Sequence, residues 1–373
     1  MNYYKQPTPN LNMSLFYRKS HTQPSLFSTQ RVKGFIDRLQ NKKNTDEYLR
    51  LHEIINFEAY RLEIETCVTK CTKTKQRQAK GRPSFDPVFI FKALWLMHRI
   101  GMSKRQFHDA MLTDAVIQSA LDIEYPDEVP SYQSLWLYDN YFAKTQLLKT
   151  LLDKQIQQLD DQGLLPERSD RVIDSTFYEV PRQHNKSEEN RLIKVGQGQE
   201  LWKENPNKRR HKDIDARWTK KRGINFFGYK GHISIDSENK FVVGCVVTSA
   251  SVHDSQVITP LISQRDRGRR LYADAGYIGK AQEDAIIDSC MIPMICEKAF
   301  RNSPLTEQQK ANNREKSKTR SRVEHAFGFI EGCMGKTKLH CVGIVRATHE
   351  ILFDMLVYNG ARLRQIIRKT QAT

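Results

Sequence analysis

The sequence has no run of about 18 apolar residues, the length that a helix needs to cross a bilayer. Its first 30 residues lack the apolar segment of a secretory signal. The seven cysteines are odd in number and scattered, and no second cysteine pair or histidine cluster completes a zinc set. These absences argue against a membrane protein, a disulfide scaffold and a zinc module, and they predict a cytoplasmic protein in a reducing compartment.

Negative charge is also scarce. The chain of 373 residues carries 60 Lys and Arg against 43 Asp and Glu, which leaves a formal charge of +17. Such a surplus predicts a polyanionic partner, and nucleic acid is the commonest one because neutralised phosphates release their counterions. Binding to a ribosome or to a membrane surface is the alternative. The length allows two or three domains.

Composition and periodicity divide the chain in three. Residues 1–30 are rich in Asn, Gln, Ser, Thr and Pro, which predicts a flexible arm. Residues 31–150 are predicted to form a helical domain with a basic linker at 70–82. One apolar helix should end at Gly101, and Ser103 stands three residues before Gln106, a capping-box spacing. Short helices with tight turns fit a helix-turn-helix DNA reader or a plain helical packing domain.

Residues 151–373 have a different pattern. Strand-like runs lie at 171–180, 226–236, 241–250, 270–273 and 292–297, and helical runs lie at 254–264, 279–289, 305–333 and 347–369. Three strands followed by alternating helices and strands predict a mixed β-sheet flanked by helices, the order of an RNase H-like α/β fold. A polar, basic insertion at 183–222 interrupts this order and is predicted to close over DNA. Its candidate DNA contacts are Arg217, Lys220, Lys221 and Arg222.

Two aspartates stand in or after apolar strands. Asp174 follows Val172-Ile173, and Asp274 ends the short strand of RRLYADAGYIG. A partly buried carboxylate is costly unless a cation meets it, and Mg²⁺ or Mn²⁺ takes oxygen ligands in octahedral geometry. Asp174 and Asp274 are therefore predicted metal ligands, although an aspartate that only caps a turn gives the same pattern.

A third acid, Glu324, lies in a helical segment whose apolar stripe is Val323, Ala326, Phe327 and Ile330. Arg320 lies one turn earlier on the same side, so the glutamate is predicted to face the strand ends. An ordinary Arg-Glu helix pair is the alternative. Lys230, in GYKGH, is expected near the end of a strand, where it serves either as a DNA contact or as a structural hydrogen-bond donor.

The segments GRPSFDPVFIFKALWL, DARWTKKRG, GYKGH, ASVHDS, YADAGYIG and RSRVEHAFGFIEG occur in this order. Over about residues 80–370 the chain resembles the DDE transposases of bacterial insertion sequences, specifically the insertion-sequence-five family. The resemblance implies that Asp174, Asp274 and Glu324 are the catalytic, metal-binding acids and that Arg320 contacts DNA near the cleaved end.

The family pattern Y-x2-R-x3-E-x6-K is only partly kept. Ser317 replaces the tyrosine and Glu331 replaces the lysine. Lys336 or Lys338 is therefore expected to supply the phosphate contact, and Glu331 is a rival acid to Glu324.

The resemblance implies an enzyme that cuts the ends of a mobile DNA element and joins the 3′-OH to target DNA. Two ions of Mg²⁺ or Mn²⁺ would serve the reaction, and a homodimer is expected because two element ends must be handled together. Two alternatives remain open at this point: an RNase H-like nuclease that cuts without joining, and a non-catalytic DNA-binding protein derived from a transposase.

Overall fold

The computed structural model describes residues 54–72, 84–183, 185–221, 223–300, 303–335 and 338–372. The arm predicted at residues 1–30, and the predicted basic linker beyond residue 72, lie outside these ranges. The element order of the described chain begins with η1 (Phe57–Tyr60) and α4 (Arg61–Thr72). No described helix combines the length and apolar content that crossing a membrane requires.

The first part of the described chain is helical, as its pattern predicted. It comprises α5 (Pro87–Ile100), α6 (Lys104–Thr113), α7 (Ala115–Leu121), η2 (Pro126–Glu128), α8 (Tyr132–Lys144) and α9 (Leu147–Asp161). Helix α5 ends at Gly101 with a φ of 80°, a left-handed conformation that glycine adopts without a Cβ clash. Ser103 and Gln106 form the predicted capping box at the start of α6. These local signals therefore set the helix ends.

A mixed sheet follows, formed by β1 (Arg171–Glu179), β2 (Arg217–Lys221), β3 (Ile224–Asp236), β4 (Val242–Ser249), β5 (Arg270–Ala273) and β6 (Ile292–Ile295). Strand β3 pairs antiparallel with β1, β2 and β4. Strand β5 pairs parallel with both β1 and β6. An antiparallel meander of β1, β3 and β4 extended by two parallel strands is the RNase H-like order, so the predicted fold class is confirmed.

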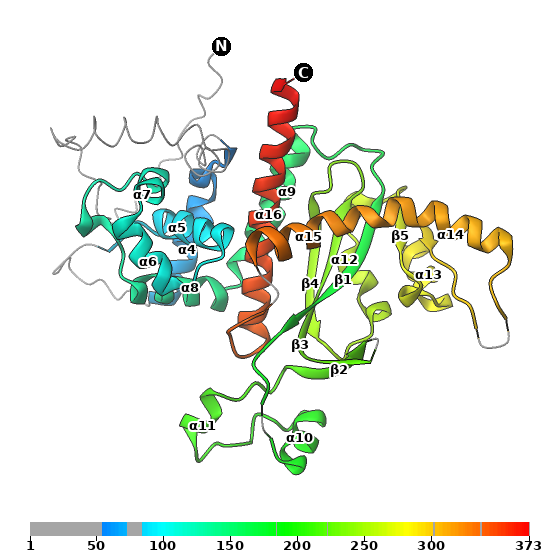
Figure 1. Ribbon diagram of the computed structural model, residues 1–373, viewed down its shortest axis with the longest axis horizontal. Helices are drawn as coiled ribbons and strands as arrows, with labels where there is room; N and C mark the ends of the chain where they lie inside the picture. Colours follow the sequence, from blue (N-terminus) through cyan, green and yellow to red (C-terminus); the bar gives the residue numbers. More distant parts are fainter. Residues whose placement is uncertain are drawn as a thin grey trace.

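Helices cover both faces of this sheet (Figure 1). One face carries η3 (Asp254–Val257), α12 (Ile258–Leu261), η4 (Gln264–Asp266), η5 (Ala275–Tyr277) and α13 (Lys280–Asp288). The helical run predicted at 305–333 is divided into α14 (Glu307–Arg320), η6 (Ser321–Val323) and α15 (Glu324–Met334). This run crosses the sheet in Figure 1, and α16 (Ile344–Ala372) stands between the sheet and the helical part.

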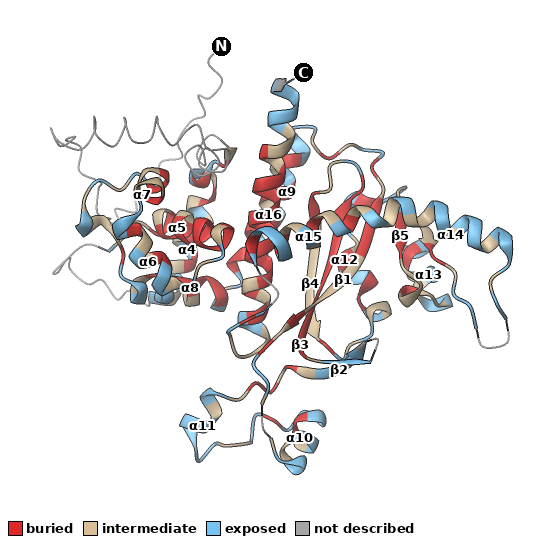
Figure 2. Cartoon of the chain, in the orientation of Figure 1, coloured by how far each residue is buried: buried red, intermediate tan, exposed pale blue. Residues whose placement is uncertain are grey.

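The larger hydrophobic core is continuous across residue 150. It joins α5 and α8 to α16 and to side chains of β1 and β3, and Figure 2 shows this buried zone through α5, α16 and the strands. The rings of Phe91 on α5 and Phe353 on α16 stack at 5.4 Å. A second core, which includes Ile173, Tyr277 and Ile286, lies under α12 and α13. The helical part and the sheet therefore pack as one body through α16.

The basic insertion forms a lobe with α10 (Ser187–Lys194) and α11 (Pro206–Arg210) that projects beyond the end of β1 (Figure 1). Its return to the sheet is anchored by Asp213, which is 2% exposed. The two carboxylate oxygens of Asp213 accept from the Tyr229 hydroxyl at 2.8 and 2.7 Å, and one also accepts from the Gly343 N–H at 3.0 Å. The lobe is thus fixed to β3 and to the chain before α16.

The close approach of α5 to α15 gives a stability prediction. A Cβ on Gly101 would lie 2.4 Å from the Met334 carbonyl oxygen, whereas a Cβ on Gly163, at a φ of 69°, would meet nothing within 4 Å. Gly163→Ala should cost about 1 kcal/mol for its left-handed backbone alone. Gly101→Ala should cost clearly more because α5 and α15 must separate. Urea denaturation of both variants measures the difference, and equal losses would contradict it.

Candidate active site

Asp174 lies on β1, and Asp274 directly follows the end of β5, the parallel neighbour of β1. The β1–β5 pairs are Arg171 with Leu271 and Val172 with Tyr272, a constant offset of 100 that also relates the two aspartates. Adjacent strands are about 4.8 Å apart, and partners in register project to the same face of a sheet. The two carboxylates therefore face the same side, at the level where β5 ends.

Local hydrogen bonds orient each of these carboxylates. Asp274 follows the last residue of β5 and caps η5, with Oδ1 accepting from the Gly276 N–H at 2.8 Å. A Cβ on residue 276 would lie 2.9 Å from that oxygen, which explains the glycine. Asp174 Oδ1 accepts from the Ser175 N–H at 2.8 Å. Oδ1 of each aspartate is thus oriented by a backbone N–H one or two residues further along the chain.

Arg320, the last residue of α14, meets the first of these acids. Its Nη1 lies 3.1 Å from Asp174 Oδ2, and the two side chains are 25% and 21% exposed. The pair ties the crossing helix to β1 at the level of Asp174. The positive charge of the guanidinium stabilises the ionised form of this carboxylate.

Glu324 begins α15 one turn after Arg320. The predicted apolar stripe packs against the larger core, in which Val323, Ala326 and Ile330 are buried. Glu324 itself is exposed. Within the described ranges no group of three or more His, Cys, Asp and Glu side chains stands close enough to hold a metal ion. Asp174 and Asp274 thus come from neighbouring strands, whereas Glu324 and the rival Glu331 are exposed on the surface of α15.

A polar cluster on the opposite face of the sheet was not resolved by sequence reasoning. Lys230 Nζ donates to Asp254 Oδ1 at 2.9 Å and to the Val252 carbonyl at 2.6 Å, and the side chain is 8% exposed. Ser175 Oγ donates to the same Asp254 oxygen at 3.1 Å. Of the two roles predicted for Lys230, the structure therefore shows the structural hydrogen bonds, with the ammonium turned inward. The segment ASVHDS, which contains Asp254, was the sequence feature that could have indicated this partner of Lys230.

Burial controls the protonation of the neighbouring side chains. Desolvation lowers the pKa of His232 to about 4, against the opposing charge of Asp254, so this imidazole is neutral at pH 7. Its Nε2 lies 2.9 Å from the Thr248 hydroxyl. Burial first, and then the charges of Asp254, Asp174 and Asp274, raise the pKa of Tyr277. The Tyr277 hydroxyl therefore keeps its proton at pH 7.

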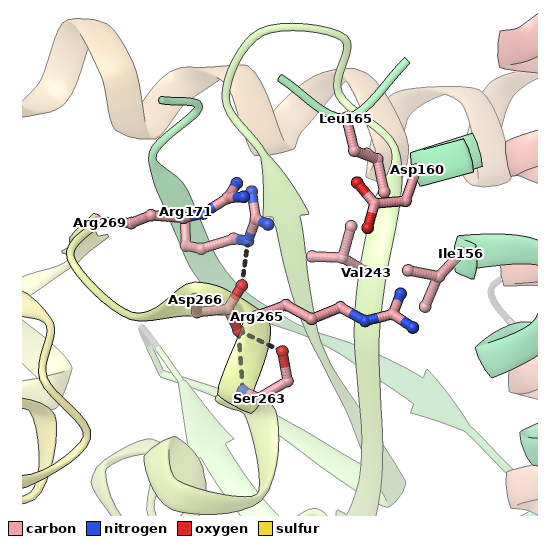
Figure 3. A pocket seen from close by; sticks show the side chains of 9 residues that line it. All are labelled: Ile156, Asp160, Leu165, Arg171, Val243, Ser263, Arg265, Asp266 and Arg269. Atoms are coloured by element: carbon pink, nitrogen blue, oxygen red, sulfur yellow. Dashed lines mark hydrogen bonds and ion pairs between the residues drawn. The ribbon is translucent and has the colours of Figure 1, made fainter. Parts of the chain in front are cut away.

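An arginine-lined pocket lies at the other end of β1 (Figure 3). Arg171 Nε is bound to Asp266 Oδ1 at 2.6 Å, and Asp266 Oδ2 accepts from the backbone and hydroxyl of Ser263 at 2.8 and 2.9 Å. Arg269 Nη1 donates to the Ser169 carbonyl at 3.0 Å. Arg171 is paired with Asp266 and Arg269 is held by backbone carbonyls, so we interpret the pocket as a structural junction of the sheet.

Residues 165–359, more than half of the chain, match the family described as "Transposase DDE domain", and residues 36–140 match "Transposase domain (DUF772)". The chain is 32% identical over 213 residues, 57% of its length, to the transposase for insertion sequence element IS1106 of Neisseria meningitidis serogroup B, and it covers 71% of that protein. The chain belongs to the DDE transposase family.

The predicted identification as a transposase, an enzyme, is therefore confirmed, and the family is metal-dependent. Among solved structures, the transposase is similar to a piggyBac transposase synaptic complex with hairpin DNA, at 10% identity and a TM-score of 0.45, over 90% of this chain and 77% of the other. That likeness is too low to carry an argument about the site.

The basic residues predicted to contact DNA are placed differently from one another in the transposase. The Arg217 guanidinium donates to the carbonyls of Ile214, Ala216 and Ile193 at 2.6 to 3.0 Å, and so holds the lobe together. Lys220 is exposed on β2 beside Trp218, whose side chain is also exposed. Arg222 and Lys336 lie outside the described residues, as does the side chain of Lys221.

Proposed function

We propose that this transposase cuts DNA at the ends of a mobile element and joins the freed 3′-OH to target DNA, with Asp174 and Asp274 at the centre of the reaction. The observation that supports the proposal is the pairing of β1 with β5, whose constant offset of 100 also separates the two aspartates and so predicts that both carboxylates face one side of the sheet. Hard divalent cations prefer such oxygen ligands. Asp174 and Asp274 would therefore hold Mg²⁺ or Mn²⁺, as two ions in the full site.

Glu324 is our candidate for the third acid. It stands one turn after Arg320, whose guanidinium is 3.1 Å from Asp174, so a change of side-chain rotamer turns it toward the strand ends. Glu331 lies seven residues further along α15, on nearly the same side of the helix. The ion pair between Arg320 and Asp174 favours Glu324 over Glu331. It holds the start of α15, where Glu324 lies, near the two aspartates, whereas Glu331 lies about two turns further on.

The residues divide the work between orientation and charge. The Ser175 and Gly276 N–H groups direct Oδ1 of each aspartate, and Arg320 Nη1 binds Oδ2 of Asp174. Arg320 holds Asp174 in place and supplies positive charge where a DNA phosphate approaches. When bound, the divalent ions would activate water or a 3′-OH and stabilise the leaving oxygen. No covalent protein nucleophile is required, because positioning and electrostatics supply the rate.

Double-stranded DNA is the proposed partner, in agreement with the formal charge of +17. Among the described candidates of the insertion, Lys220 is exposed, and we propose that it contacts DNA. Lys221, Arg222 and Lys336 are further candidates. We also propose that two copies assemble on DNA, because the ends of one element must be processed together.

Metal removal tests this function. The full chain is incubated with a duplex copied from the boundary of the element that encodes it, and with a pre-cut form of the same duplex plus target DNA. We expect EDTA to abolish both cleavage and joining, and added Mg²⁺ or Mn²⁺ to restore them. Cleavage without any joined product would instead identify a nuclease. Persistence of cleavage in EDTA would overturn the assignment of the two aspartates.

A further inference from the structure

The turn between β3 and β4 is held in a fixed shape. Asp236, which ends β3 and is fully buried, accepts from the Glu238 N–H at 3.0 Å and from the Asn239 N–H at 2.9 Å. Lys240 closes the turn with a φ of 64°. A turn whose N–H groups are engaged by one buried carboxylate presents its carbonyl oxygens outward.

Groups from two helices bind these carbonyl oxygens and bring cations to the turn. Arg322 of η6 donates to the Ser237 carbonyl, and Arg362 Nε of α16 donates to the Asn239 carbonyl at 2.6 Å. The Tyr358 hydroxyl donates to the Lys240 carbonyl at 2.8 Å. Lys240, Arg322 and Arg362 therefore surround one four-residue turn, and we call them the hairpin cation cluster.

Positive charge exceeds negative charge at this cluster, because three cations meet the two carboxylates of Asp236 and Glu238. Glu238 lies 3.7 Å from Arg322 Nη1, but its side chain is 59% exposed, and an ion pair so open to water compensates little. Burial first, and then the charges of Arg362, Arg322 and Lys369, lower the pKa of Lys240.

Arg322 and Arg362 are brought together because both donate to carbonyls of the turn that carries Lys240. Like charges crowded in this way favour the arrival of an anion, which would relieve their mutual repulsion.

The cluster lies close to the candidate active site. Arg322 stands two residues after Arg320, which binds Asp174, and two residues before Glu324. The turn follows Asp236, which pairs with Arg171, three residues before Asp174 on β1 and hence about 10 Å away along the strand. Phosphates of a duplex repeat at about 3.4 Å of rise per strand. A duplex engaged at Asp174 thus has backbone phosphates at the distance of the cluster.

We propose that Lys240 and Arg322 of the hairpin cation cluster bind the phosphate backbone of target DNA during joining, while Arg362, which is 8% exposed, adds its charge from below the surface. This inference rests on the proposed function and names a surface for one of its substrates. The neighbouring amides are engaged internally, since Asn239 Nδ2 donates to the Leu164 carbonyl and Gln365 Oε1 accepts from Arg362. The cluster therefore offers charge without base reading, and contacts to phosphate alone carry no sequence information. Target DNA of arbitrary sequence fits such a surface better than an element end.

The test measures how affinity depends on salt. Binding of a random-sequence duplex to the full chain is followed by fluorescence anisotropy between about 50 and 200 mM KCl. Each lost phosphate contact should reduce the slope of log affinity against log salt by about 0.9, so the double variant Lys240→Gln, Arg322→Gln should lose about 1.8. Lys240→Arg should keep the wild-type slope. Lys280→Gln, at an exposed site on α13, is the matched control on the other face of the sheet and should also keep it.

A second arm separates the two sources of DNA. The double variant should cut the boundary duplex at the wild-type rate while joining to random-sequence target falls with target affinity. An unchanged salt slope in the double variant would overturn the proposal. An equal loss of affinity for the boundary duplex would assign the cluster to the element end and overturn the target assignment. Failure of the wild-type chain to cut the boundary duplex would count against the proposed function, while the salt slope would still decide whether the cluster binds DNA.

Discussion

Asp174→Asn and Asp274→Asn should each lower the rate of strand cleavage by about 10³-fold or more, because a carboxylate that holds a catalytic ion contributes several kcal/mol and each 1.36 kcal/mol is a factor of ten. Asparagine is the sharper substitution than alanine. Its Oδ1 still accepts from the Ser175 or Gly276 N–H, so the local backbone is preserved. At position 174 the substitution removes the contact with Arg320 as well as the charge.

The controls for this experiment lie in the same chain. Asp284→Asn removes a carboxylate from an exposed position of α13 and should leave cleavage unchanged. Binding of the boundary duplex should persist in both active-site variants, measured by anisotropy. If either variant cut DNA at the wild-type rate, the two aspartates would be turn-capping residues and not catalytic ones.

The same assay decides between the two glutamates of α15. Glu324→Gln should lower the cleavage rate as much as the aspartate variants do, and Glu331→Gln should retain most of it. The reason is that only the start of α15 is tied to Asp174 through Arg320. The reverse ranking would transfer the third acid to Glu331.

Asp266→Ala should lower the free energy of unfolding by about 3–5 kcal/mol, the usual effect of breaking a buried ion pair. The partner Arg171 is 3% exposed and Asp266 is 4% exposed, so the variant leaves an uncompensated cation inside the protein (Figure 3). Repulsion from Arg269, whose own pKa is lowered first by burial and then by Arg171, adds to the effect. Urea denaturation of the full chain measures the loss.

A control uses a pair at the start of β5 that is more open to water. Arg270 Nε lies 3.3 Å from Asp170 Oδ1, and the two side chains are 54% and 16% exposed, so Asp170→Ala should cost about 1 kcal/mol, less than Asp266→Ala. Replacing both members of the buried pair, as Arg171→Met with Asp266→Leu, should recover much of the stability because no charge then remains unpaired. Equal losses for Asp266→Ala and Asp170→Ala would refute the assignment of Asp266 to a buried pair.

Much of the fold could be predicted because its signals are local. The capping box of Ser103 and Gln106, the stop at Gly101 and the strand at 171–180 depend on neighbouring residues alone. The break of the helical run at residues 321–323 was not predicted, since the apolar stripe continues through it. The helix is interrupted where Arg320 reaches across to β1, which is a tertiary contact.

The site was predicted in its residue types but not in its contacts. The spacing of 100 between Asp174 and Asp274 was visible in the sequence, yet only the pairing of β1 with β5 shows that it equals the strand register. Lys230 and His232 alternate along β3 with the apolar Ile233 and Ile235. Alternation predicts two faces, but it does not say that the second face contains Asp254 as a buried partner.

Helix α16 also limits how the helical part of this transposase can be exchanged between relatives. Because its side chains complete the packing of α5 and α8 and also cover β3 and β4, the helical part is not an interchangeable cassette. A recombinant that takes residues 54–161 from a distant relative would meet a mismatched surface on this helix. Such an exchange should therefore preserve the fold only when α16 is transferred together with the helices it supports.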